Sequence, residues 1–390
     1  MSPRIRVLHV ITRLIVGGAQ ENTIETVCGL DPNGFEVELV CGSQTGSEGS
    51  LLDEARGRGA KIRIEPSLVR EFSPVHDPKA LLRLTKTMRD GRYDIVHTHS
   101  SKAGILGRLA ARRAGVPAVV HTVHGWPFRQ GQPALLRVLY TVMERFAAAR
   151  TDRLLAVTHR DVDKGVEAGV AGRERFEIVR SAIDMARFSK SASERAGVRE
   201  SWGVGPETRV IGAITRLSPQ KAPLDFVAAA AEIAAAQPDV VFVLVGDGPM
   251  RSRVERAIRD HGLGGRFRML GLRRDVSELL SGMDVFLLTS LWEGLPRALV
   301  QAMAVGVPVV ATAVDGSSEI VLEQETGRLV PPGDPQTAAR VVLEILRDPI
   351  SAARCGTTAQ RMVERDFDLS RMLEQLAQLY RTLSKGNPVG

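Results

Sequence analysis

Apolar runs alternate with amphipathic patterns along the whole chain of 390 residues. Several runs are continuous stretches of valine, isoleucine and leucine, which is typical of parallel strands that helices cover on both faces. In the first half, the predicted strands are 4–11, 35–41, 61–64, 94–98, 118–123, 153–157 and 175–179. In the second half, they are 209–214, 240–245, 267–270, 285–289 and 307–312. Two successive arrays of strands and helices predict an α/β protein with two doubly wound domains.

Small and polar residues interrupt this rhythm at 189–206, so we expect the domain boundary there. The predicted domains are residues 1–195 and residues 200–368. Helical patterns at 335–347, 351–365 and 369–384 close the chain, and apolar residues recur at helical spacing in the last of them. A chain of this length exceeds one ordinary hydrophobic core, which also favours two domains.

The chain is basic, with a formal net charge of +7 and a pI near 9.6. It has no block of lysine and arginine, and aromatic residues make up 4% of it, so nucleic-acid binding is not expected. No apolar run is long enough to cross a membrane, and a predicted strand starts almost at once, which predicts no signal peptide. The three cysteines are far apart and odd in number, which favours a reduced, cytoplasmic setting.

The most informative stretch is 290–312, which follows a predicted buried strand. Glu293 and Gly294 lie in the loop after that strand, and Pro296 suits the first turn of a helix. A second apolar strand follows the helix, so the stretch predicts a strand–loop–helix–strand unit. Ligands of open α/β sheets bind at the carboxyl ends of the strands, and helix N-termini favour phosphate. Glu293 is therefore a candidate ligand-binding residue.

Two other loops carry groups that suit a phosphate. Gly17 and Gly18 follow the first strand, where the backbone can approach an anion closely at a helix start. Arg216 and Lys221 lie five positions apart after the first strand of the second half. Two fixed cations can neutralise a leaving diphosphate without a metal ion. Taken alone, the first loop is better explained as a tight turn and the second as a solvated basic loop.

The motifs together resemble those of the retaining GT-B glycosyltransferases of family 4, the glycosyl transferases group 1. The resemblance rests on the stretch 290–312, the Gly17-Gly18 loop, the Arg216/Lys221 loop and the segment 121–126 that contains His124. It covers nearly the whole chain, and the motifs occur in the order of the family. It implies a GT-B fold, in which two Rossmann-like domains face a central cleft and the last helix, within 369–390, packs back on the N-terminal domain.

The resemblance also assigns roles to individual residues. It implies that Arg216 and Lys221 stabilise the departing diphosphate, that Glu293 holds hydroxyls of the donor sugar and that His124 contacts the sugar ring. The loop of Gly17 and Gly18 faces the donor phosphate. Further donor-binding residues by this resemblance are Gly246, Gly248, Leu272, Gly294, Leu295, Gln301 and Glu319.

Gln301 departs from the family, which has a glutamate here that accepts hydrogen bonds from the ribose. An amide oxygen can accept them too, but less strongly than a carboxylate. Weaker donor binding, a changed donor preference and a loss of activity all remain open.

The implied activity is transfer of a sugar with retention from a nucleotide-diphosphate donor, with a UDP-sugar favoured. The implied acceptor is a glycan or a lipid-linked sugar, in the synthesis of a cell-surface polysaccharide or glycolipid. No metal or other cofactor is expected. Two alternatives stay open: a catalytically silent nucleotide-sugar-binding protein, and a GT-B enzyme of another kind such as a sugar-nucleotide epimerase.

Histidines and acidic pairs offer weaker candidates for a metal site. His97, His99, His121 and His124 lie near the ends of two strands, but no carboxylate or thiol accompanies them at ligand spacing, so we expect ordinary polar residues of loops or strand ends. The Asp-x-Asp pairs at 161–163 and 366–368 lie in or before helices, which does not suit a metal-dependent site.

The segment 133–153 has apolar residues at helical spacing, accompanied by arginines. Such a helix can lie in the headgroup layer of an anionic membrane, which would give a peripheral protein at the inner face of the plasma membrane. The alternative is a helix whose apolar face packs in the core and whose basic edge is solvated.

Overall fold

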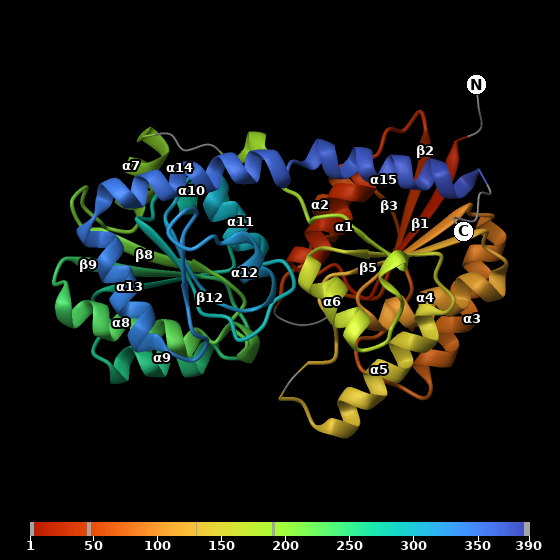
Figure 1. Cartoon of the computed structure of the whole chain (residues 1–390), viewed down its shortest axis with the longest axis horizontal. Helices are drawn as coiled ribbons and strands as arrows, with labels where there is room; N and C mark the ends of the chain where they lie inside the picture. The colour runs from red at the N-terminus through yellow and green to blue at the C-terminus, as the bar shows by residue number, and fades with distance from the viewer. Residues whose placement is uncertain (1–3, 45–47, 130, 189–191, 386–390) are drawn as a thin grey trace. The chain divides into compact units, whose positions relative to one another are not determined.

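The computed structural model describes residues 4–44, 48–129, 131–188 and 192–385. The start of the predicted linker, 189–191, and the end of the chain, 386–390, lie outside the described residues. The chain forms two compact units, one of Met1–Ala182 with Leu369–Gly390 and one of Ile183–Asp368 (Figure 1). The division falls before the predicted linker, because Ile183 pairs with Asp368 as an isolated bridge within the second unit.

The first unit is built on a parallel sheet with the strand order β3-β2-β1-β4-β5-β6-β7. Its strands are β1 Ile5–Ile11, β2 Phe35–Cys41, β3 Lys61–Ile64, β4 Ile95–His99, β5 Ala118–Val123, β6 Arg153–Ala156 and β7 Phe176–Ile178. Its helices are α1 Gly18–Gly29, α2 Leu52–Gly57, α3 His76–Gly91, α4 Ser101–Ala114, α5 Ala134–Ala148, α6 His159–Glu167 and α15 Leu369–Ser384, with a 3-10 turn η1 at Arg173–Arg175. The order reverses between β1 and β4, so the loops after these strands border a switch point.

Alternation along the strands divides the core of this unit between the two faces of the sheet. Val7 and Ile95 pack with Leu376 and Tyr380 of α15. Leu8 packs on the other face, in a cluster with residues of α3 and α4. Helix α15 therefore covers one face and α3 and α4 the other (Figure 1).

The second unit repeats the pattern with the strand order β10-β9-β8-β11-β12-β13. Its strands are β8 Arg209–Ile214, β9 Val240–Val245, β10 Phe267–Gly271, β11 Val285–Leu288, β12 Val309–Thr312 and β13 Arg328–Val330. Its helices are α7 Ala192–Ser201, α8 Pro223–Ala236, α9 Arg251–Asp260, α10 Val276–Ser281, α11 Arg297–Ala304, α12 Asp315–Ile320, α13 Pro335–Arg347 and α14 Pro349–Asp366, with 3-10 turns η2 at Met185–Arg187 and η3 at Pro219–Lys221. The switch point here lies between β8 and β11.

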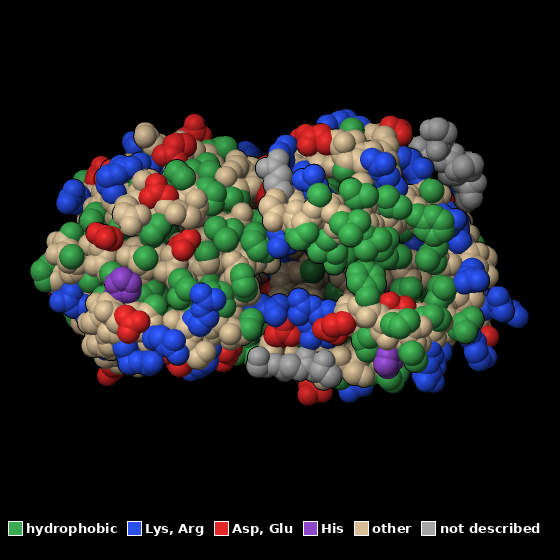
Figure 2. Space-filling model, turned by 90° about the horizontal axis from the view of Figure 1, so that it is seen from below, with side chains coloured by type: hydrophobic (Ala, Val, Ile, Leu, Met, Phe, Trp, Pro, Cys, Tyr) green, Lys and Arg blue, Asp and Glu red, His purple; other side chains and the backbone are tan. Residues whose placement is uncertain are grey.

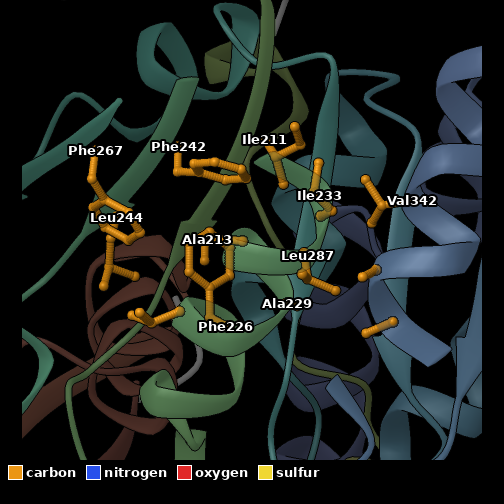
Figure 3. Packing of buried hydrophobic residues seen from close by; sticks show 14 of the residues in the cluster. Ile211, Ala213, Phe226, Ala229, Ile233, Phe242, Leu244, Phe267, Leu287 and Val342 are labelled. Carbon is orange, nitrogen blue, oxygen red and sulfur yellow. The ribbon is translucent and has the colours of Figure 1, made fainter. Parts of the chain in front are cut away.

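Aromatic and small residues interlock in the core of the second unit (Figure 3). Phe226 from α8 meets Phe267 from β10 edge to face, with ring centroids 5.9 Å apart. Phe242 of β9 also stacks against Phe267, with centroids 6.0 Å apart. Alanines of α8 let the helix approach the sheet, and Val342 of α13 joins the same cluster. This packing fixes β8 and β11, whose ends carry the candidate site.

The predicted strands are present in the structure with ends that differ by one or two residues. The edge strand β13 was missed, because three residues are too few to show a period. Within the described residues, no helix combines the length and the apolar character needed to cross a membrane.

Candidate active site

Glu293 lies in the loop after β11, where its carboxylate is nearly buried, with 5% of the side chain exposed. Its Oε1 forms an ion pair with Nζ of Lys221 and accepts a hydrogen bond from Oγ of Ser290 at 2.6 Å. Its backbone N–H donates to Oδ2 of Asp315 at 3.1 Å, at the start of α12. The loop after β11, the Lys221 loop and the start of α12 therefore together hold Glu293, the residue that the sequence singled out.

The loop that carries Lys221 is tied to the loop after β11. The backbone N–H of Leu291 donates to the carbonyl of Gln220 at 2.8 Å, and Nε2 of Gln220 donates to the carbonyl of Trp292 at 3.0 Å. Oγ1 of Thr289 donates to the carbonyl of Lys221 at 3.1 Å. These bonds hold the backbone of Lys221 before any ligand arrives, which is the preorganisation that charge stabilisation needs. Arg216 is half-buried on the same loop.

Gly246 and Gly248 follow β9 and pack directly against this cationic loop. A Cβ on Gly246 would lie 2.0 Å from the carbonyl oxygen of Thr215, and one on Gly248 would lie 2.6 Å from that of Leu217. Gly246 also has a φ of +127°, which side chains rarely adopt. The glycines are thus required by the packing of the Arg216/Lys221 loop, apart from any contact with a ligand.

The remaining predicted residues of the second unit surround the same sheet edge. Gly294 accepts a hydrogen bond at its carbonyl from Gly316 N–H at 3.1 Å, which joins the Glu293 loop to α12. Leu295 and Gln301 are buried, before and within α11. Glu319 is half-buried on α12. Leu272 follows β10 and keeps 42% of its surface exposed.

In the first unit, Gly17 and Gly18 lie at the start of α1. Gly18 begins the helix and Gly17 caps it with an extended backbone at φ 176°. The loop is anchored by an ion pair between Arg13 and Glu48 at 2.9 Å and by the backbone bond from Val16 N–H to the carbonyl of Glu48 at 3.2 Å. It therefore presents helix N–H groups at the switch point of its own sheet.

His124 follows β5 and is half-buried, with Nε2 3.1 Å from Nδ1 of His99. The expectation of loop or strand-end histidines holds for His99, which is the last residue of β4. It was wrong for His97 and His121, which lie within β4 and β5, and all three side chains are buried. His9 of β1, which the sequence analysis missed, joins them, with Nδ1 2.9 Å from Nε2 of His99. The sequence could have indicated the burial of His9, because it lies two positions after Val7 in the apolar strand and therefore on the same strand face.

Burial keeps these rings neutral at pH 7, because the interior disfavours the charged form. It lowers the pKa of His9 to about 3. It also lowers the pKa values of His97 and His99 well below 6.5, and the neighbouring histidines add to this effect. His9, His97 and His99 could each offer one nitrogen to a metal ion. However, each of their ring nitrogens has a hydrogen-bond partner already.

The structure thus brings Arg216, Lys221 and Glu293 to one sheet edge of the second unit, together with the loops that carry the other predicted donor-binding residues. Gly17, Gly18 and His124 lie at the corresponding edge of the first unit. Two Rossmann-like units with polar and glycine-rich loops at their switch points are typical of α/β proteins that bind a nucleotide or a related phosphate-bearing ligand.

Comparison with known proteins identifies the family. Residues 195–362 match the family described as glycosyl transferases group 1, and residues 17–182 match the glycosyl transferase 4-like domain. The Escherichia coli UDP-Gal:alpha-D-GlcNAc-diphosphoundecaprenol alpha-1,3-galactosyltransferase is 30% identical over 97% of each chain. The Streptomyces kanamyceticus 2-deoxystreptamine glucosyltransferase is 32% identical over 69% of this chain and 72% of its own. The structure of Anabaena HepE in complex with UDP and glucose superposes with a TM-score of 0.84 at 22% identity, covering 97% of this chain and 100% of HepE.

The chain belongs to the GT-B glycosyltransferases of family 4. It is a glycosyltransferase of the hexosyltransferase type, and its relatives include a galactosyltransferase and a glucosyltransferase.

Proposed function

We propose that this enzyme transfers a hexose from a UDP-sugar, with retention, to a lipid-linked or glycan acceptor in the synthesis of a cell-surface polysaccharide or glycolipid. The observation that carries the proposal is the ordered Lys221–Glu293 pair at the switch point of the second unit. The name of the Escherichia coli relative supplies the donor class and the lipid diphosphate acceptor, and HepE was solved with UDP and glucose.

The chain supplies positive charge at the place where the reaction develops negative charge. As the bond from C1 of the sugar to the diphosphate oxygen breaks, Lys221 and Arg216 stabilise the negative charge on the leaving group. The acceptor oxygen forms its bond to C1 on the same face, and its proton passes to the leaving phosphate. Glu293 holds the sugar hydroxyls and His124 the ring, so no carboxylate nucleophile is needed. Gln301 accepts from the ribose through its amide oxygen.

The activity test is hydrolysis or transfer from UDP-galactose and UDP-glucose, read as released UDP. We expect turnover of at least one donor, and a donor at 100 times its dissociation constant should stabilise the fold by about 2.7 kcal/mol. Stabilisation by a UDP-sugar without release of UDP, with a lipid diphosphate acceptor present, would favour the silent binding protein. Conversion into an isomeric UDP-sugar would favour an epimerase.

We expect the same turnover in the presence of EDTA, because the two cations replace a metal at the leaving diphosphate. The measurement is the rate of UDP release before and after dialysis against the chelator. Loss of activity that Mn²⁺ or Mg²⁺ restores would contradict the cationic mechanism. The His9, His97 and His99 cluster would then be the first place to search for the ion.

We also propose that helix α5 docks on an anionic membrane. The helix exposes its apolar face instead of burying it: the exposed fraction is 83% for Leu135, 56% for Val138, 53% for Val142 and 50% for Phe146. Hydrophobic side chains gather on the side of the molecule that carries α5 (Figure 2). An apolar face of this kind is typical of an interfacial helix, and a lipid-linked acceptor would be met at such a surface.

Replacement of both Leu135 and Val142 by glutamate should abolish binding to vesicles of anionic phospholipid, because it removes apolar area and adds repulsion. The measurement is co-sedimentation at low and high salt. Ile350 on α14, exposed at 84%, is the matched control, and Ile350→Glu should bind as the wild type does. Recovery of the wild type in the supernatant with anionic and neutral vesicles alike would contradict membrane docking.

A further inference from the structure

A continuous line of polar side chains crosses the buried sheet of the first unit. His9 on β1, His97 and His99 on β4 and Thr122 on β5 share the sheet face that α15 covers, since they alternate with residues of the opposite face. Tyr380 of α15, which is fully buried, reaches them from above the sheet. No step of the proposed transfer uses these groups directly, yet buried polar groups are costly unless each one is paired.

The contacts form one chain that ends at His124. Thr122 Oγ1 lies 2.7 Å from His97 Nε2, and His97 Nδ1 lies 2.5 Å from the hydroxyl of Tyr380. The same hydroxyl lies 3.4 Å from His9 Nε2. His9 Nδ1 lies 2.9 Å from His99 Nε2, and His99 Nδ1 lies 3.1 Å from Nε2 of His124.

Such a chain has two arrangements of protons in which the Tyr380 hydroxyl donates to one neighbouring ring and accepts from the other. A neutral imidazole carries one N–H and one lone pair, so a ring that accepts at one nitrogen donates at the other. Each junction needs one donor and one acceptor, and therefore the direction of one hydrogen bond sets the direction of all the others. Burial lowers the pKa values of His9, His97 and His99, which keeps the rings neutral and the rule in force at pH 7.

Tyr380 selects between the two arrangements. A phenol donates to an imidazole nitrogen more strongly than it accepts from one, so its proton belongs in the shorter contact, the one to His97 Nδ1. The hydroxyl oxygen then accepts from His9 Nε2–H across the longer contact. It follows that His99 Nε2–H donates to His9, and that His124 Nε2–H donates to His99.

We propose that Tyr380, through His9 and His99, is a positioning residue that fixes His124 as the Nε2–H tautomer, with Nδ1 as the hydrogen-bond acceptor that the donor sugar meets. The consequence for catalysis rests on the proposed role of His124 at the sugar ring. The last helix of the chain thereby sets the hydrogen-bonding character of a site residue on a distant segment. A tautomer with Nδ1–H would offer the sugar hydroxyl a donor in place of an acceptor and would change the hydrogen bonds that this hydroxyl makes.

The test breaks the line of hydrogen bonds between Tyr380 and His9, by changing each of the two residues in turn. Tyr380→Phe removes the hydroxyl, and His9→Asn keeps a polar atom near the Nδ1 position for His99 but cannot reach Tyr380. Tyr93 is the matched control, because it is also buried in the first unit and donates a hydrogen bond to Glu38 at 2.7 Å outside the chain. The ¹⁵N shifts of His124, assigned with His124→Gln, report its tautomer directly in the protein without substrate.

We expect His124 in the wild type and in Tyr93→Phe to be wholly Nε2–H, and to become a mixture of tautomers in Tyr380→Phe and His9→Asn. The KM for the UDP-sugar should rise at least fivefold in Tyr380→Phe and His9→Asn, with a smaller change in kcat, and remain unchanged in Tyr93→Phe.

An Nδ1–H ring of His124 in the wild type, or an unchanged tautomer in both Tyr380→Phe and His9→Asn, would overturn the inference. So would a metal ion that co-purifies at one per chain and is lost in His9→Asn. If the tautomers behave as expected but no UDP-sugar is turned over, the proposed function is wrong, while the assignment of the His124 tautomer through the hydrogen bonds remains supported.

Discussion

Lys221→Ala should lower the rate of UDP release at least about a hundredfold, since the loss of one preorganised charge donor typically costs ~2.7–4 kcal/mol of transition-state stabilisation. Lys221 is the cation whose place is fixed before the donor binds, through its ion pair with Glu293 and the backbone ties of its loop. The side chain lies on a loop and is not part of the hydrophobic core, so the fold should survive. The measurement is kcat for a UDP-sugar, with circular dichroism to show that the variant is folded.

A second variant separates the two effects of this change. Lys221→Ala also leaves the Glu293 carboxylate, with its 5% exposed side chain, without its counter-ion. That carboxylate would then repel the donor diphosphate. In the double variant Lys221→Ala with Glu293→Gln, the unpaired charge is gone but the missing cation is not restored. We expect the double variant to remain at least as slow as the single one. Recovery of most of the activity would show that Lys221 serves only to neutralise Glu293.

The sequence predicted the parts of the site that depend on the order of local segments. Glu293, Arg216 and Lys221 follow apolar runs, and parallel strands bring such loops to one sheet edge. The resemblance to the family distinguished the Arg216/Lys221 pair from an ordinary basic loop. The sequence could not show that Lys221 pairs with Glu293, which are 72 positions apart. That pairing depends on β8 lying next to β11, and the order of strands in a sheet is a tertiary property.

The contacts of the buried histidines and the exposed face of α5 are features that the hydrophobic periodicity of the sequence could not predict. His9 is one of two polar residues in the otherwise apolar strand β1, and the sequence gives no sign that Tyr380, 371 positions later, lies beside it. For α5, the amphipathic pattern was compatible with a buried apolar face and with an exposed one. Only the packing decides, and it turns Glu144 inward and Leu135 outward.

The second large effect that we predict is on stability, and it concerns the buried side of α5. Glu144 of α5 and Arg108 of α4 form an ion pair at 2.6 Å with 1% and 0% of their side chains exposed. Arg108 Nε also donates to the carbonyl of Gly104 at 2.8 Å. Glu144→Ala should lower the free energy of unfolding by about 3–5 kcal/mol, because it leaves a buried guanidinium without its counter-ion. Urea denaturation of Glu144→Ala and of the wild type measures the difference in the free energy of unfolding.

The exposed pair of Lys86 and Asp90, on α3 of the same unit, provides the control. Its side chains are 77% and 60% exposed, so Lys86→Ala should change the free energy of unfolding by less than about 1 kcal/mol. Replacing both buried partners, as Arg108→Met with Glu144→Leu, removes the charge together with its counter-ion and should recover most of the loss. If Glu144→Ala proves as mild as Lys86→Ala, the pair does not hold α5 to α4. The exposed apolar face of α5 would then need another anchor to be presented to a membrane.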